Sequence, residues 1–96
     1  MVVVWSKRAA RELLQAYKYI YCDSPQTAAK VRDAIIKMTI LLSKNPEAHP
    51  LDKYKKGNDG NWRAFEKYRY RISYRILENE IRVVRMRHTS RSPSNY

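Results

Sequence analysis

The alternation of apolar and basic residues between Tyr70 and Ile76 constrains the fold of this chain more than any other feature of its sequence. One set of alternate positions is aromatic or aliphatic: Tyr70, Ile72, Tyr74 and Ile76. The other set is polar and mostly cationic: Arg69, Arg71, Ser73 and Arg75. Successive side chains of a β-strand point to opposite faces of a sheet, so the pattern predicts a strand with one core face and one cationic face.

Two further strands are predicted beside this one. Trp62 to Lys67 forms a preceding strand, and Ile81 to His88 returns as an antiparallel partner after a hairpin tip at Glu78-Asn79. The last third of the chain is therefore predicted to be an antiparallel three-stranded meander. A basic sheet face with His, Arg and Tyr residues at its edge is suited to holding a nucleic-acid phosphate.

The first half of the chain predicts a short strand followed by a helical hairpin. Val2 to Trp5 is rich in β-branched residues, and the hydroxyl of Ser6 can cap a helix that follows. Apolar residues then recur every three or four positions over 7–21. The same spacing resumes after Ser24-Pro25, a cap with proline at the first helical position, and stops at Asn45-Pro46.

Residues 45–61 are predicted to form a surface loop, because two prolines and the run Gly57 to Gly60 interrupt regular structure there. Together these elements predict one α+β domain over residues 1–96, with the order β-α-α-β-β-β. Helices in such a domain cover one face of the sheet, which leaves the opposite face and the strand ends for function.

The charge of the chain favours an anionic partner. Its 96 residues include 20 Lys and Arg against 9 Asp and Glu, a formal net charge of +11. Such an excess attracts nucleic acid, ribosomes or an acidic protein. The longest apolar stretch, Ile35 to Leu42, contains Lys37 and is far shorter than the roughly 20 residues that span a bilayer. The N-terminus has no signal-peptide pattern, and with a single cysteine, Cys22, a cytoplasmic location is expected.

No metal or cofactor is expected. One cysteine with two histidines, His49 and His88, does not make a zinc site, and no close cluster of carboxylates suggests a magnesium nuclease. The two glycines, Gly57 and Gly60, bracket a turn and do not form a phosphate-binding loop.

Several short motifs, in this order and in a basic chain of this length, resemble those of one protein family. They are Val4-Trp5-Ser6 followed by Ala9 or Ala10 and Leu13, Tyr19-Ile20, Ala28 and Ile35, Asn45-Pro46, Tyr70-Arg71-Ile72-Ser73-Tyr74, and Arg82-Val83-Val84-Arg85-Met86-Arg87-His88. Together they resemble the RelE/ParE superfamily of bacterial type II toxin-antitoxin (plasmid stabilisation) toxins. The resemblance implies a small sheet carrying a helical hairpin, and a cognate antitoxin that wraps and neutralises the toxin.

The superfamily holds two activities. RelE-like members cut mRNA on the ribosome without a metal, whereas ParE-like members poison DNA gyrase and do not cut RNA. Metal-free RNA cleavage needs a base, cations for the phosphorane and an acid for the leaving oxygen. By resemblance, Arg71 would contact the scissile phosphate and Arg63 would stand near a catalytic lysine position. His88, Arg91 and Tyr96 would complete the catalytic group at the C-terminus.

Seven further basic residues are candidates for nucleic-acid binding: Lys53, Lys55, Lys56, Arg69, Arg75, Arg85 and Arg87. Each candidate also has a simpler interpretation. The strand arginines can be a solvated sheet face or the docking surface of an acidic antitoxin, the loop lysines a solvated loop, and His88 a capping or packing residue.

Two hypotheses from different classes follow. The favoured one is a toxin that acts as a metal-independent, ribosome-dependent mRNA endoribonuclease, supported by Arg71, His88, Arg91 and Tyr96. The alternative is a non-enzymatic gyrase inhibitor, supported by the N-terminal motifs, which look more like ParE than RelE. A basic binding protein without toxicity is a third, weaker interpretation.

Overall fold

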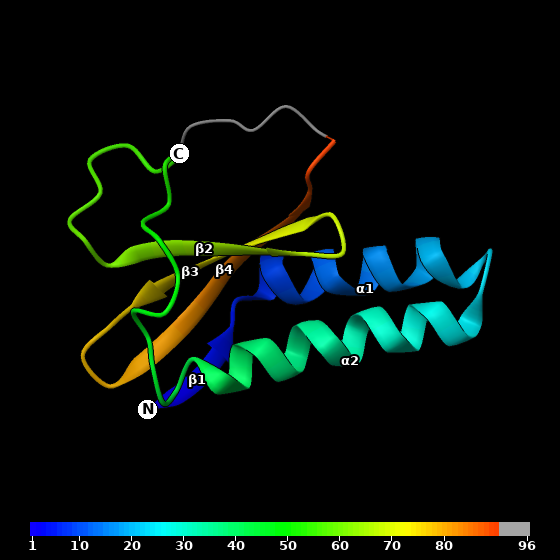
Figure 1. The fold of residues 1–96 in the computed structure, drawn as a ribbon, viewed down its shortest axis with the longest axis horizontal. Helices are drawn as coiled ribbons and strands as arrows, with labels where there is room; N and C mark the ends of the chain where they lie inside the picture. Colours follow the sequence, from blue (N-terminus) through cyan, green and yellow to red (C-terminus); the bar gives the residue numbers. More distant parts are fainter. Residues whose placement is uncertain (91–96) are drawn as a thin grey trace.

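The computed structural model describes residues 1–90, and Arg91 and Tyr96 lie outside this range. The chain runs β1 (Val2–Trp5), α1 (Lys7–Tyr21), α2 (Pro25–Leu41), β2 (Trp62–Lys67), β3 (Tyr70–Ile76) and β4 (Glu80–His88). Figure 1 shows α1 and α2 as a long antiparallel hairpin that extends beyond the sheet. The predicted order of elements and the α+β class are confirmed.

The four strands form one mixed sheet in the order β1-β4-β3-β2. β2, β3 and β4 pair antiparallel as the predicted meander. β1 adds to the far side of β4 in parallel, with Val3 beside Ile81 and Trp5 beside Val83. The alternation in the sequence predicted the meander but did not indicate where the first strand would pair.

Each helix begins at a serine cap, as predicted. The hydroxyl of Ser6 accepts a hydrogen bond from the Ala9 N–H at 3.0 Å, and that of Ser24 accepts one from the Thr27 N–H at 3.2 Å. Each bond satisfies a backbone donor that the first helical turn leaves without a partner. Pro25 follows Ser24 at the start of α2, where its missing N–H costs nothing.

The hairpin packs against one face of the sheet and closes a single core. This core contains Ala9, Ala16, Val31, Ile35, Leu42, Phe65, Tyr70, Ile72, Tyr74, Ile81, Val83 and Met86. Ile72 and Tyr74 are fully buried. The apolar positions of the β3 alternation therefore face the helices, and Arg71 and Arg75 face the other way.

The segment between α2 and β2 covers the outer edge of β2. Leu51 forms an antiparallel bridge with Arg63, the Asp52 N–H donates to the Trp62 carbonyl at 2.8 Å, and the Ala64 N–H donates to the Pro50 carbonyl at 3.2 Å. Asp52 is buried, with 2% of its surface exposed. The predicted surface loop is therefore also an edge cover with a buried carboxylate.

A two-residue turn, Tyr68 and Arg69, joins β2 to β3. Both residues have left-handed φ angles, 52° and 66°, although neither is glycine. The prediction that Arg69 belongs to the cationic strand face is wrong, because the turn takes it out of the strand. The predicted hairpin tip at Glu78-Asn79 is confirmed, since β3 ends at Ile76 and β4 begins at Glu80.

Candidate functional site on the helix-free sheet face

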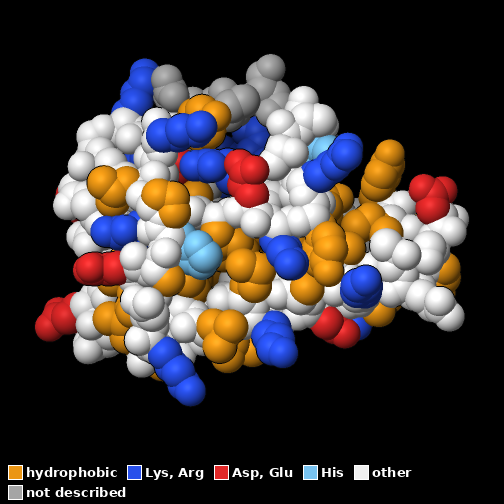
Figure 2. Space-filling model, viewed as in Figure 1, with side chains coloured by type: hydrophobic (Ala, Val, Ile, Leu, Met, Phe, Trp, Pro, Cys, Tyr) orange, Lys and Arg blue, Asp and Glu red, His pale blue; other side chains and the backbone are white. Residues whose placement is uncertain are grey.

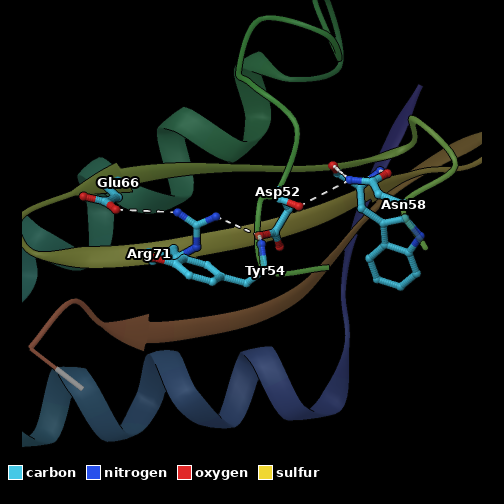
Figure 3. Close-up of polar contacts among 6 residues, drawn as sticks. Asp52, Tyr54, Asn58, Glu66 and Arg71 are labelled. Atoms are coloured by element: carbon cyan, nitrogen blue, oxygen red, sulfur yellow. Dashed lines mark hydrogen bonds and ion pairs between the residues drawn. The ribbon is translucent and has the colours of Figure 1, made fainter. Parts of the chain in front are cut away.

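Arg71 lies at the centre of a polar cluster on the sheet face away from the helices. Its guanidinium donates to the carboxylate of Asp52 at 2.7 Å and lies 3.5 Å from the carboxylate of Glu66. The guanidinium carbon also sits 4.7 Å from the centre of the Tyr54 ring. Figure 3 shows Arg71 between the two carboxylates and against this ring. Glu66 is the cross-strand partner of Arg71, so strand register places them together.

This environment changes the role that Arg71 can have. Only 18% of its side chain is exposed, and the side chain of Asp52 is fully buried. Arg71 is therefore a largely buried member of this cluster and not part of a solvated sheet face. Two carboxylates already engage its guanidinium, so a phosphate approaching Arg71 would have to displace one of them.

Cations stacked on aromatic rings continue along the same face. The Lys55 ammonium and the Arg75 guanidinium lie 4.4 Å and 4.9 Å from the centre of the Trp62 ring. Lys53 lies 5.3 Å from the ring centre of Tyr54. Each contact is a cation–π interaction of about 0.5–1 kcal/mol at a partly exposed site. These contacts bring predicted nucleic-acid-binding residues from the loop and from β3 to one surface.

His88 lies on the opposite face of the sheet from Arg71. Tyr70 pairs with His88 and Arg71 pairs with Arg87, so His88 shares the helix side with Tyr70. The His88 ring stands edge-on to Tyr70, with 5.1 Å between ring centres. It lines a pocket of about 420 Å³ between α1 and the end of β4, whose walls include Glu12, Gln15 and Tyr19.

Hydrogen bonds determine which nitrogen of His88 carries the proton. The Ser90 N–H points at Nδ1 at 3.1 Å, and the Ser90 hydroxyl lies 2.7 Å from the same nitrogen. A backbone N–H can only donate, so Nδ1 accepts and the neutral ring carries its proton on Nε2. His88 thus caps the end of β4, the simpler role that the sequence left open.

Arg63 is also separated from Arg71. It pairs with Tyr74 and donates from Nη1 to the His49 carbonyl at 2.8 Å, which ties the loop to β2. Its Nε is buried without a hydrogen-bond partner. Arg63, Arg71 and His88, predicted to act on one phosphate, therefore do not meet at one point of the structure.

The remaining predicted residues divide between the cationic sheet face and the connecting segments. Arg85 and Arg87 lie on β4 beside Ser73 and Arg71, in register with the cationic face of β3. Lys56 is exposed in the loop, and Arg69 lies in the turn after β2. Figure 2 shows Lys and Arg side chains spread over the visible surface, with hydrophobic side chains gathered where the sheet meets the helices.

The carboxylates and Tyr54 around Arg71 were missed by sequence reasoning. Asp52 precedes Lys53 in a segment whose sequence predicts a solvated basic loop. No local sequence pattern there indicates that the Asp52 side chain is buried. Glu66 could have been found, because a two-residue turn after Lys67 puts it opposite Arg71.

Two ionisable side chains, one in the loop and one on β3 beneath it, have shifted pKa values. Burial raises the pKa of the Tyr74 hydroxyl above its usual 10.0, although the nearby charge of Arg63 opposes the shift. The Tyr74 hydroxyl donates to the Pro46 carbonyl at 2.6 Å. Burial lowers the pKa of His49 below its usual 6.5, and its ring lies 4.8 Å from that of Phe65.

Within residues 1–90, no group of three or more His, Cys, Asp or Glu side chains is arranged to hold a metal ion. No helix in this range has the length and apolar character needed to cross a bilayer.

Comparison with known protein families identifies one family that matches nearly the whole chain. The family model described as the ParE toxin of the type II toxin-antitoxin system parDE matches residues 3–93. This chain belongs to the ParE toxin family. Membership makes it the toxin of a type II toxin-antitoxin module and implies a cognate antitoxin as its partner. No curated protein matches it significantly.

Solved structures share the fold of this ParE-family toxin. A chain of the chromosomal ParDE toxin-antitoxin system from P. aeruginosa superposes with a TM-score of 0.71 at 20% identity, covering 92% of this chain and 95% of the other. The YoeB dimer structure from Staphylococcus aureus gives 0.60 at 16% identity, with the same coverages of 92% and 95%. At these identities the likeness concerns the fold alone.

Proposed function

We propose that this ParE-family toxin inhibits growth by binding DNA gyrase through protein contacts, and that it does not cleave RNA. One observation carries the proposal: Arg71, the residue expected to hold the scissile phosphate, is already bound by Asp52 and Glu66. Membership of the ParE family supports the same conclusion, since the ParE-like branch of the superfamily is the gyrase-poisoning one.

The proton-transfer groups also argue against a nuclease. A general base must reach the proton that it abstracts, at about 2.6–3.2 Å or through one water. The Asp52 carboxylate is fully buried, so RNA cannot reach it. His88 lies across the sheet from Arg71, with its Nδ1 engaged by Ser90.

RNA cleavage is the second candidate, and one observation favours it. The surface formed by Lys53, Tyr54, Lys55, Trp62 and Arg75 combines cations with aromatic rings, a combination that binds single-stranded nucleic acid. On this alternative, that surface would hold RNA while Arg71 exchanged a carboxylate for a phosphate.

Induced expression of the toxin without its antitoxin separates the two functions. Gyrase poisoning predicts accumulating DNA double-strand breaks while translated mRNAs stay intact, and a gyrase mutation that restores growth. The variant His88→Gln should remain fully toxic, because a glutamine oxygen can still accept from the Ser90 N–H. Cleavage of translated mRNAs that His88→Gln or Arg71→Lys abolishes would establish the nuclease instead.

A further inference from the structure

The sheet face without helices carries a group of cations that comes from the loop before β2, from β3 and from β4. We call this group the basic face. Its members are Lys53, Lys55, Arg75, Arg82, Arg85 and Arg87. Arg71 lies among them but is engaged by Asp52 and Glu66. Strand register and the loop thus bring cations from distant parts of the chain to one surface.

Strand register sets two arginines of the basic face directly opposite each other. Arg75 of β3 pairs with Arg82 of β4. Like charges in this position destabilise a sheet. Arg82 has Glu80 as a partner at 3.1 Å. In contrast, no carboxylate of residues 1–90 forms an ion pair with Arg75 or with Lys53. A bound anion would offset this remaining charge, so the face is arranged for an anionic ligand.

Aromatic rings hold the cations of the loop and of β3 in place. The Trp62 ring lies against Lys55 and Arg75, at 4.4 Å and 4.9 Å, and the Tyr54 ring lies against cations of the same two elements. Proteins that bind single strands stack successive bases on such rings. Here the rings already hold cations, so the face offers ordered charge and not a stacking platform. This arrangement favours contact with phosphates over contact with bases.

We propose that the basic face binds the phosphate backbone of duplex DNA without regard to base sequence. Lys53 and Arg75 would make the main contacts, because they lack a carboxylate partner among residues 1–90. The inference rests on the proposed function and deepens it. Gyrase acts on duplex DNA, so the toxin would contact the DNA of the complex as well as the enzyme.

Charge density favours a duplex over a single strand as the occupant. Double-stranded DNA carries one negative charge per roughly 1.7 Å of its axis, about twice the density along one strand. Same-face positions of a sheet are roughly 5 Å apart across strands and roughly 7 Å apart along them, so cations fixed there lie close together. Such a surface releases more counterions from a duplex than from a single strand. The net charge of +11 adds long-range attraction for the same polyanion.

The test measures binding of the full-length toxin to a short labelled DNA duplex, and to single-stranded DNA and RNA of equal length, by fluorescence anisotropy across a salt series. The double variant Lys53→Gln and Arg75→Gln should bind the duplex about tenfold more weakly for each lost cation at about 0.1 M salt. The reason is that each phosphate contact contributes a slope of about 0.9 to log K against log salt. The matched control, Arg11→Gln with Lys18→Gln, removes the same charge from exposed positions of α1. It should bind within about twofold of the parent, because salt screens distant charges.

Three binding results would overturn the proposal, once circular dichroism shows that all variants are folded. Equal losses in the two double variants would mean that affinity follows net charge and not the basic face. Tighter binding of single-stranded RNA than of the duplex would favour the nuclease instead. Absence of binding to any nucleic acid would assign the face to an acidic protein.

The link to gyrase is tested separately, by DNA breakage with purified gyrase and the same variants. The Lys53→Gln and Arg75→Gln variant should cause less breakage, in step with its lower DNA affinity. Unchanged breakage by this variant would overturn the link and leave gyrase inhibition standing. Absence of breakage with the parent toxin would refute the proposed function, whereas the binding series would still decide whether the face holds DNA.

Discussion

Arg71 donates a hydrogen bond of 2.7 Å to Asp52, a residue of the loop that precedes β2 whose side chain is fully buried. The pair joins the loop to the middle of the sheet, and Asp52 also accepts from the Tyr54 N–H at 3.1 Å. An arginine predicted from sequence to bind a phosphate is thus an anchor of the fold.

Replacing Asp52 by asparagine should lower the free energy of unfolding by about 2–3 kcal/mol, because it leaves a largely buried guanidinium without its main counter-charge. Urea denaturation followed by tryptophan fluorescence measures the change. Glu66→Gln is the matched control, since 59% of the Glu66 side chain is exposed. It should cost no more than about 1 kcal/mol, and equal effects of the two variants would contradict the anchor role.

Replacing Arg69 by glycine should stabilise the protein by up to about 1 kcal/mol, because glycine adopts the left-handed φ of 66° without strain. Greater freedom of glycine in the unfolded chain reduces the gain. Thermal unfolding measures it, and Thr89→Gly, outside the strained turn, serves as a control. A lower melting temperature for Arg69→Gly would contradict the prediction, because it would mean that the relief of strain is smaller than the added entropy of the unfolded chain.

Replacing Tyr74 by phenylalanine should cost about 1 kcal/mol at neutral pH, because the Pro46 carbonyl loses its donor. The parent should also lose stability as the pH rises above 10.0. The unfolded chain then releases the hydroxyl proton first, since burial raises the pKa in the folded state. Urea midpoints of parent and variant across alkaline pH test both effects, and an unchanged pH dependence in Tyr74→Phe would refute the second.

Lowering the pH below 6.5 should destabilise the protein through His49. Burial lowers the pKa of this ring in the folded state, so the unfolded chain binds the proton first. The stabilisation that comes from keeping His49 neutral is fully present above pH 6.5. It decreases as the pH falls from 6.5 through the lower pKa of the folded state. His49→Gln should flatten this part of the curve, because it removes the titrating ring. An NMR titration of the His49 ring that gave a pKa above 6.5 would reverse the predicted sign.

Local sequence patterns determined most of the secondary structure and the class of fold. Ser6 and Ser24 act through bonds to backbone groups three residues away, and the β3 alternation depends only on the period of a strand. These are short-range effects that a sequence displays directly. Ordered motifs were also enough to indicate the superfamily, which the match over residues 3–93 confirmed.

The sequence by itself determined a basic α+β toxin with a helical hairpin on one face of a sheet, because capping, periodicity and charge are local or additive properties. Only the tertiary structure decided that β1 pairs in parallel with β4, that Asp52 is buried against Arg71, and that His88 lies on the other face. Each of these depends on contacts between residues far apart in the chain, and no local pattern encodes which distant partner a strand edge or a charged side chain will meet.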